Sequence, residues 1–85
     1  MKELRKDMLI SIDNNWLEYI GNNGYCEIKT KQDIDFIEQL FNLQQNGYIK
    51  IIYENLNMMS SSAILFTSIQ LTQKGKDIVK SIRKG

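Results

Sequence analysis

The spacing of apolar residues predicts that the chain begins with a helix. One face is formed by apolar residues that recur every four positions, namely Leu4, Met8, Ile12, Trp16 and Ile20. This is the pattern of an amphipathic helix over roughly residues 2 to 21. Ser, Asp and Asn between residues 11 and 15 favour caps and turns over helix interiors. The segment is therefore either one helix or two helices that meet near residue 13, and the Gly and Asn residues from 21 to 24 end it.

A short strand and a second helix are predicted next. Residues 25 to 29 alternate in part, which is typical of a brief strand. Thr30 and Asp33 resemble a capping box, although the usual third residue is Glu or Gln. The helix that follows is expected to run to about Asn46 and to end at Gly47. Its apolar side is expected to consist of Ile34, Ile37, Leu40, Phe41 and Gln44, widened by Phe36 and Leu43.

The second half of the chain predicts a hairpin and a last helix. From Tyr48 to Glu54 the residues alternate, with Ile49, Ile51 and Tyr53 on one face and Tyr48, Lys50, Ile52 and Glu54 on the other. Residues 63 to 71 form the expected return strand, with Leu65, Ile69 and Leu71 on a shared face, after a loop of about eight residues. Thr72 is a good N-cap for a helix over roughly residues 73 to 83. Gly75 lies on the inward stripe of that helix. Either the helix approaches the hairpin too closely for a side chain, or the glycine is a tolerated surface residue.

Length and composition limit the class of protein. Eighty-five residues suit one domain, residues 1–85, and the net charge of +1 gives no overall attraction to nucleic acid or membrane. One cysteine and no histidine exclude an internal disulfide and a structural zinc site, so we expect no metal and no cofactor. Cys26 lacks a histidine to activate it and is interpreted as a small buried residue. No apolar run is long enough to span a membrane, so a cytoplasmic, non-enzymatic protein is expected.

The order of these elements resembles a known fold. Long helix, short strand, helix, β-hairpin and C-terminal helix make an α+β arrangement of the winged-helix type. Gln45-Asn46-Gly47-Tyr48-Ile49 resembles the junction between helix and wing in such proteins, and Leu71-Thr72-Gln73-Lys74-Gly75-Lys76 resembles the entry to their last helix. The chain is similar to the small YjcQ-like winged-helix proteins of Gram-positive bacteria and their phages, over residues 33 to 82 and, for the first helix, by pattern alone. That family is mostly uncharacterised, so the resemblance implies the fold and no binding residue.

The resemblance favours a double-stranded DNA partner, and the charges only partly agree. In a winged helix, residues 31 to 46 would occupy the recognition helix. Residues 33 to 46 carry a net charge of −3, and residues 55 to 62, at the wing, contain no Lys or Arg. Positive charge gathers in the last helix instead, either as a solvated face or as a phosphate-binding patch. The residues we expect to contact DNA are Lys31, Gln39, Asn42, Lys74, Lys76, Lys80 and Arg83.

Two functions are therefore open. The first is a DNA-binding transcriptional regulator or accessory protein of a phage, plasmid or other mobile element. The second is a protein-interaction module, with a contact surface that would consist of Asp33, Asp35, Glu38, Met58 and Met59. A homodimer is expected in either case, because the first helix is apolar on more than one side, at Leu9, Ile10, Leu17 and Tyr19.

Overall fold

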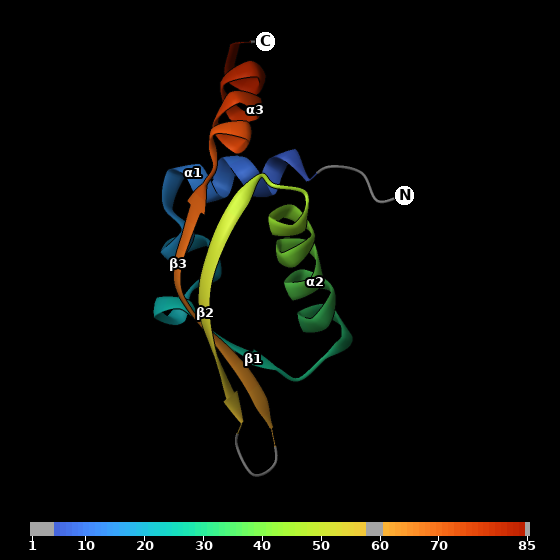
Figure 1. The fold of residues 1–85 in the computed structure, drawn as a ribbon. Coiled ribbons are helices and arrows are strands. Elements are labelled where there is room, and N and C mark those ends of the chain that lie inside the picture. The colour runs from blue at the N-terminus through green and yellow to red at the C-terminus, as the bar shows by residue number, and fades with distance from the viewer. Residues whose placement is uncertain (1–4, 58–60, 85) are drawn as a thin grey trace.

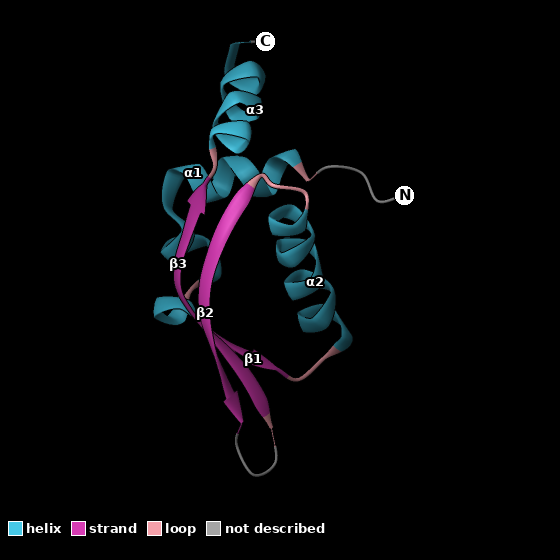
Figure 2. Cartoon of the chain, in the orientation of Figure 1, coloured by secondary structure: helices cyan, strands magenta, loops and turns pink. Residues whose placement is uncertain are grey.

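The predicted order of elements is confirmed by the computed structural model, which describes residues 5–57 and 61–84. The helices are α1 (Lys6–Ile20), α2 (Lys31–Gln45) and α3 (Gln73–Lys84), and a short 3-10 turn, η1 (Asn22–Gly24), follows α1. The strands are β1 (Tyr25–Ile28), β2 (Ile49–Asn57) and β3 (Ser62–Leu71). They form an antiparallel sheet in the order β1-β3-β2, so the described chain is an α+β fold (Figures 1 and 2).

The first helix is broken near the point that its sequence predicts. Asn15 is extended, with φ −172° and ψ 104°, while the residues on either side are helical. Its side-chain oxygen accepts the backbone N–H of Leu17 at 3.1 Å, which caps the second segment. The segment therefore consists of two helical pieces that meet at residue 15, two positions after the expected break.

The capping box at the start of α2 is confirmed. Thr30 Oγ1 accepts the Asp33 backbone N–H at 3.2 Å, and Asp33 Oδ2 accepts the N–H groups of Thr30 at 2.9 Å and Lys29 at 3.0 Å. Asp therefore replaces the usual Glu. The buried residues of α2 are Ile37, Leu40 and Leu43. The prediction for Ile34 is wrong, because its side chain is 46% exposed.

The hairpin is longer than the alternation predicts. β2 continues to Asn57 and β3 begins at Ser62, so the expected eight-residue loop is wrong. The register shifts between Ile52 and Tyr53, which pair with Ser68 and Phe66, and leaves Thr67 as the extra residue of a β-bulge. Thr67 Oγ1 donates to the Ile52 carbonyl at 3.0 Å. The bulge reverses the alternation of β3, so Leu65 does not share a face with Ile69 and Leu71 as predicted.

The core lies between one face of the sheet and the helices. Phe66, Met8, Leu9 and Leu40 are fully buried at its centre. The remaining members of this cluster are Ile12, Ile37, Leu43, Ile49, Ile51, Ile64, Ile69 and Val79. Half-buried aromatic rings close its edges, as where Tyr19 packs against Phe36 with ring centroids 5.6 Å apart. None of the described helices is long and apolar enough to cross a bilayer.

Gly75 allows α3 to approach the start of the hairpin closely. It is buried, and a Cβ at this position would lie well inside contact distance of the Tyr48 carbonyl oxygen and 3.1 Å from the carbonyl carbon. The same carbonyl accepts the Thr72 N–H at 3.0 Å. The expectation that no side chain fits is confirmed, and the surface-glycine alternative is wrong.

Candidate functional site: a basic surface on α3

The basic last helix projects at one end of an elongated molecule. α3 lies at one end in Figure 1, and the end of β2 with the start of β3 lies at the other, along a long axis of 47 Å. Val79 is buried against the core and faces α1. Arg83 reaches α1 by two contacts, to Asp13 Oδ2 at 3.0 Å and to Asn14 Oδ1 at 2.9 Å. These contacts bring one side of α3 alongside α1.

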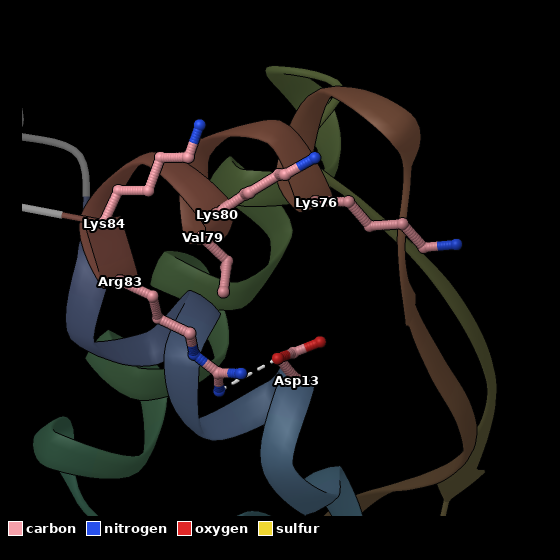
Figure 3. A pocket seen from close by; sticks show the side chains of 6 residues that line it. All are labelled: Asp13, Lys76, Val79, Lys80, Arg83 and Lys84. Atoms are coloured by element: carbon pink, nitrogen blue, oxygen red, sulfur yellow. Dashed lines mark ion pairs between the residues drawn. The ribbon is translucent and has the colours of Figure 1, made fainter.

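An open pocket of about 370 Å³ lies where these helices meet. We call it the α3 basic pocket, and it is lined by Asp13, Lys76, Val79, Lys80, Arg83 and Lys84 (Figure 3). Lys76, Lys80 and Lys84 are four residues apart and so lie on one side of the helix. All three are exposed, and none forms an ion pair or hydrogen bond within the described part of the chain. Their ammonium groups point away from Asp13 in Figure 3 and face solvent.

Asp13 partly neutralises the pocket. Its ion pair with Arg83 is half-exposed, with side-chain exposures of 34% for Asp13 and 50% for Arg83. An ion pair this accessible to water contributes about 0.2 to 1 kcal/mol. Arg83 therefore serves to hold α3 to α1, and the three lysines carry the charge that is available to a ligand.

Lys74 does not belong to this pocket, although the sequence grouped it with the other cations. Its Nζ donates to the Asn46 carbonyl at 3.0 Å and lies 4.5 Å from the centroid of the Tyr48 ring. It therefore satisfies the C-terminal end of α2 and covers an aromatic face. Lys74 joins α2 to α3.

The expected DNA-contacting residues of α2 are not gathered with those of α3. Lys31 is exposed at the first position of the helix. Gln39 is half-buried, and its side-chain oxygen accepts a hydrogen bond from Arg5. Asn42 is also half-buried. None of these three residues lines the α3 basic pocket.

The residues of the protein-contact alternative are also divided. Asp33 is committed to the helix cap, where the N–H groups of Thr30 and Lys29 hold its pKa below the ordinary value. Asp35 and Glu38 are exposed on α2. Met58 and Met59 lie outside the described residues.

The first helix offers less free apolar surface than its sequence suggests. Leu9 is fully buried, and Tyr19 and Ile10 are half-buried. Leu17 is 41% exposed. The expected dimer surface on this helix is therefore wrong for Leu9 and Tyr19, which pack with the core.

Cys26 lies half-buried on β1. Burial raises the pKa of its thiol, and the nearby Asp33 carboxylate adds to that effect. In residues 5–57 and 61–84, no group of three or more Cys, Asp or Glu side chains is placed to hold a metal ion.

The expected DNA contacts omit three residues that line the pocket, namely Asp13, Val79 and Lys84. Lys84 follows Lys80 at the same four-residue interval, so the periodicity was sufficient to include it. Asp13 had no such signal, because its place depends on how α1 crosses α3.

No family model, no curated protein and no solved structure matches this chain.

Proposed function

We propose that this chain is a small winged-helix protein that binds double-stranded DNA through the α3 basic pocket. A short strand, a helix, a β-hairpin and a terminal helix in this order, with a sheet order of β1-β3-β2, support the winged-helix assignment. A small transcriptional regulator or accessory protein would suit a single domain of this size.

The observation that carries the proposal is the free charge at Lys76, Lys80 and Lys84. α3 contains five cations and one carboxylate, a net charge of +4 on a chain whose total is +1. Lys74 and Arg83 are engaged with other parts of the protein, whereas these three lysines have no ion pair or hydrogen bond among residues 5–57 and 61–84. Phosphates are the ligands that a row of exposed ammonium groups attracts.

Binding through α3 would position DNA without reading its sequence. Lysine ammonium groups contact phosphates as point charges and do not discriminate between bases. The exposed side of α2, where base contacts would be expected, carries Asp35 and Glu38, which repel phosphate. The proposed activity is therefore sequence-tolerant and strongly dependent on salt.

The experiment is a duplex-DNA titration at two salt concentrations. Three phosphate contacts give a slope of about −2.7 in log K against log salt, or a loss of about 40-fold in affinity between 50 and 200 mM salt. The variant with Lys76, Lys80 and Lys84 changed to Glu is expected to lose binding. Wild-type protein that fails to bind duplex DNA at low salt would contradict the proposal.

A matched control variant distinguishes the effect of charge in the α3 basic pocket from the effect of the total charge of the protein. Changing Lys6, Lys29 and Lys50 to Glu alters the net charge from +1 to −5, as the pocket variant does, at exposed positions outside the pocket and outside the expected DNA contacts. The control is expected to keep most of the affinity. Equal losses in both variants would mean that total charge, and not the α3 basic pocket, governs binding.

A second candidate function is supported by the surface of α2. Ile34 is 46% exposed and lies one turn from Glu38 and beside Asp35. An exposed apolar side chain among carboxylates is typical of a protein contact, here with a basic partner. The protein would then be an interaction module, and Ile34→Asp would abolish capture of that partner without changing DNA affinity.

A further inference from the structure

The outer face of the sheet, opposite the core, carries a row of apolar side chains. The register places Ile52, Leu56, Leu65 and Tyr25 on this face, because Leu65 pairs with both Glu54 and Tyr25. Ala63 pairs with Leu56 on the same side, but it is 2% exposed and offers no surface to a partner. Ile52 is 52% exposed. Ile52, Leu56, Leu65 and Tyr25 are all absent from the core cluster and from the residues packed against it. We call these four residues, with Lys50 and Glu54, the outer sheet face.

Charges on β2 are arranged symmetrically about Ile52. Lys50 and Glu54 lie two residues before and after it, on the same side of the strand, each about 7 Å away by strand geometry. Both side chains are exposed, and neither has an ion pair or hydrogen bond within the described part of the chain. The outward positions of β2 therefore alternate in the order cation, apolar residue, anion.

A second copy of β2 that lies antiparallel over the first, face to face, would bring each charged side chain opposite one of the other sign. A twofold axis through Ile52, parallel to the sheet and perpendicular to β2, would place Lys50 opposite the partner's Glu54 and Glu54 opposite the partner's Lys50. The two Ile52 side chains would then meet at the centre. An isologous interface has this property, since each surface patch must match its own copy.

Hydrogen bonds fix the backbone of β2 at Ile51 and Ile52, the centre of the proposed contact. The Ile52 carbonyl accepts the Thr67 hydroxyl at the bulge, and the neighbouring Ile51 N–H donates to Gln44 Oε1 at 2.6 Å. The positions of Lys50, Ile52 and Glu54 are thus set before any partner arrives, which lowers the entropic cost of association.

We propose that a second copy of this chain packs on the outer sheet face, with two reciprocal Lys50–Glu54 ion pairs flanking the Ile52 contact. The apolar part of this face is small compared with the roughly 800 Å² per partner of a stable interface, so the dimer is expected to be reversible and dependent on concentration. It does not depend on DNA binding, because α3 lies outside this face.

The test is the mass in solution of charge-reversed variants, measured by sedimentation equilibrium over a wide concentration range. Lys50→Glu places two carboxylates opposite each other at both ends of the interface, and Glu54→Lys places two ammonium groups there. Each variant alone is expected to associate at least about tenfold more weakly than wild type. An equimolar mixture of the two is expected to regain the dimer, because every pair is then of opposite sign.

The mixture distinguishes this interface from a folding defect, since a misfolded variant cannot restore association to another. Lys31→Glu, a matched change at an exposed site outside the outer sheet face, is expected to leave the dimer intact. The proposal is overturned if wild-type protein is monomeric at every concentration, if either variant associates like wild type, or if the mixture stays monomeric.

Discussion

Replacing Gly75 with alanine should destabilise the protein, although the same change favours most helices. Alanine in place of glycine ordinarily stabilises a helix interior by about 1 kcal/mol. At this site the added Cβ would overlap the Tyr48 carbonyl and meet Leu71 Cδ2 at 3.3 Å. The obstacle is backbone that cannot rotate away, so α3 or the start of β2 must move.

The expected cost follows from what that movement disturbs. Overpacking a well-packed site costs about 1 to 3 kcal/mol. The same displacement strains the bond from the Thr72 N–H to the Tyr48 carbonyl, worth about 0.5 to 1.5 kcal/mol. After the helix-propensity gain is subtracted, the free energy of unfolding should fall by about 2 kcal/mol. For a domain of this size the melting temperature should fall by roughly 8 to 16 °C.

Thermal and urea denaturation of Gly75→Ala and wild type measure this difference. Ser81→Ala is the matched control, because Ser81 is exposed in the same helix and alanine there should be neutral or slightly stabilising. If Gly75→Ala proved as stable as wild type, the close approach of α3 to Tyr48 would not be the reason for the glycine.

Four further changes test other parts of the structure. Asp13→Asn removes the carboxylate from the α3 basic pocket and should increase DNA affinity. Because Arg83 then becomes available to a phosphate, the slope of log K against log salt should steepen by about 0.9. An unchanged slope would count against a role for Arg83. Thr30→Ala removes the N-cap of α2 and should lower the free energy of unfolding by about 1 kcal/mol in urea titrations. Asn15→Ala should cost about the same, because Asn15 caps the second piece of α1; no loss would mean that the cap is dispensable. The pKa of Asp33 is below its ordinary value in the folded state. Its carboxylate therefore stabilises the fold at any pH above the ordinary pKa, and this stabilisation is lost as the pH falls through the pKa of the folded state. The stability advantage of wild type over Asp33→Asn should therefore be present at neutral pH and narrow below about pH 4 in pH-dependent unfolding.

The sequence predicts the elements well where a local pattern determines them. The capping box at Thr30 and Asp33, the weak point near Asn15 and the alternation from Ile49 onward each depend on neighbouring residues, and each is present in the structure. Gly75 could also be interpreted from its sequence position, because a glycine on a packed stripe implies a close approach.

Features that depend on tertiary contacts were not predictable in the same way. The bulge at Thr67 reverses the faces of β3, and nothing in the local alternation marks it. The cations of the last helix look equivalent in sequence, yet Lys74 contacts α2 and Arg83 contacts α1. Their division into structural and free groups depends on how the helices pack.

The measurement that tests the central proposal most directly is a map of backbone amide shifts by NMR during titration with duplex DNA. DNA binding at the α3 basic pocket predicts perturbations concentrated at Lys76, Lys80, Lys84 and the adjoining turn of α1 at Asp13, with small effects along α2. Perturbations confined to α2, or none at low salt, would contradict it.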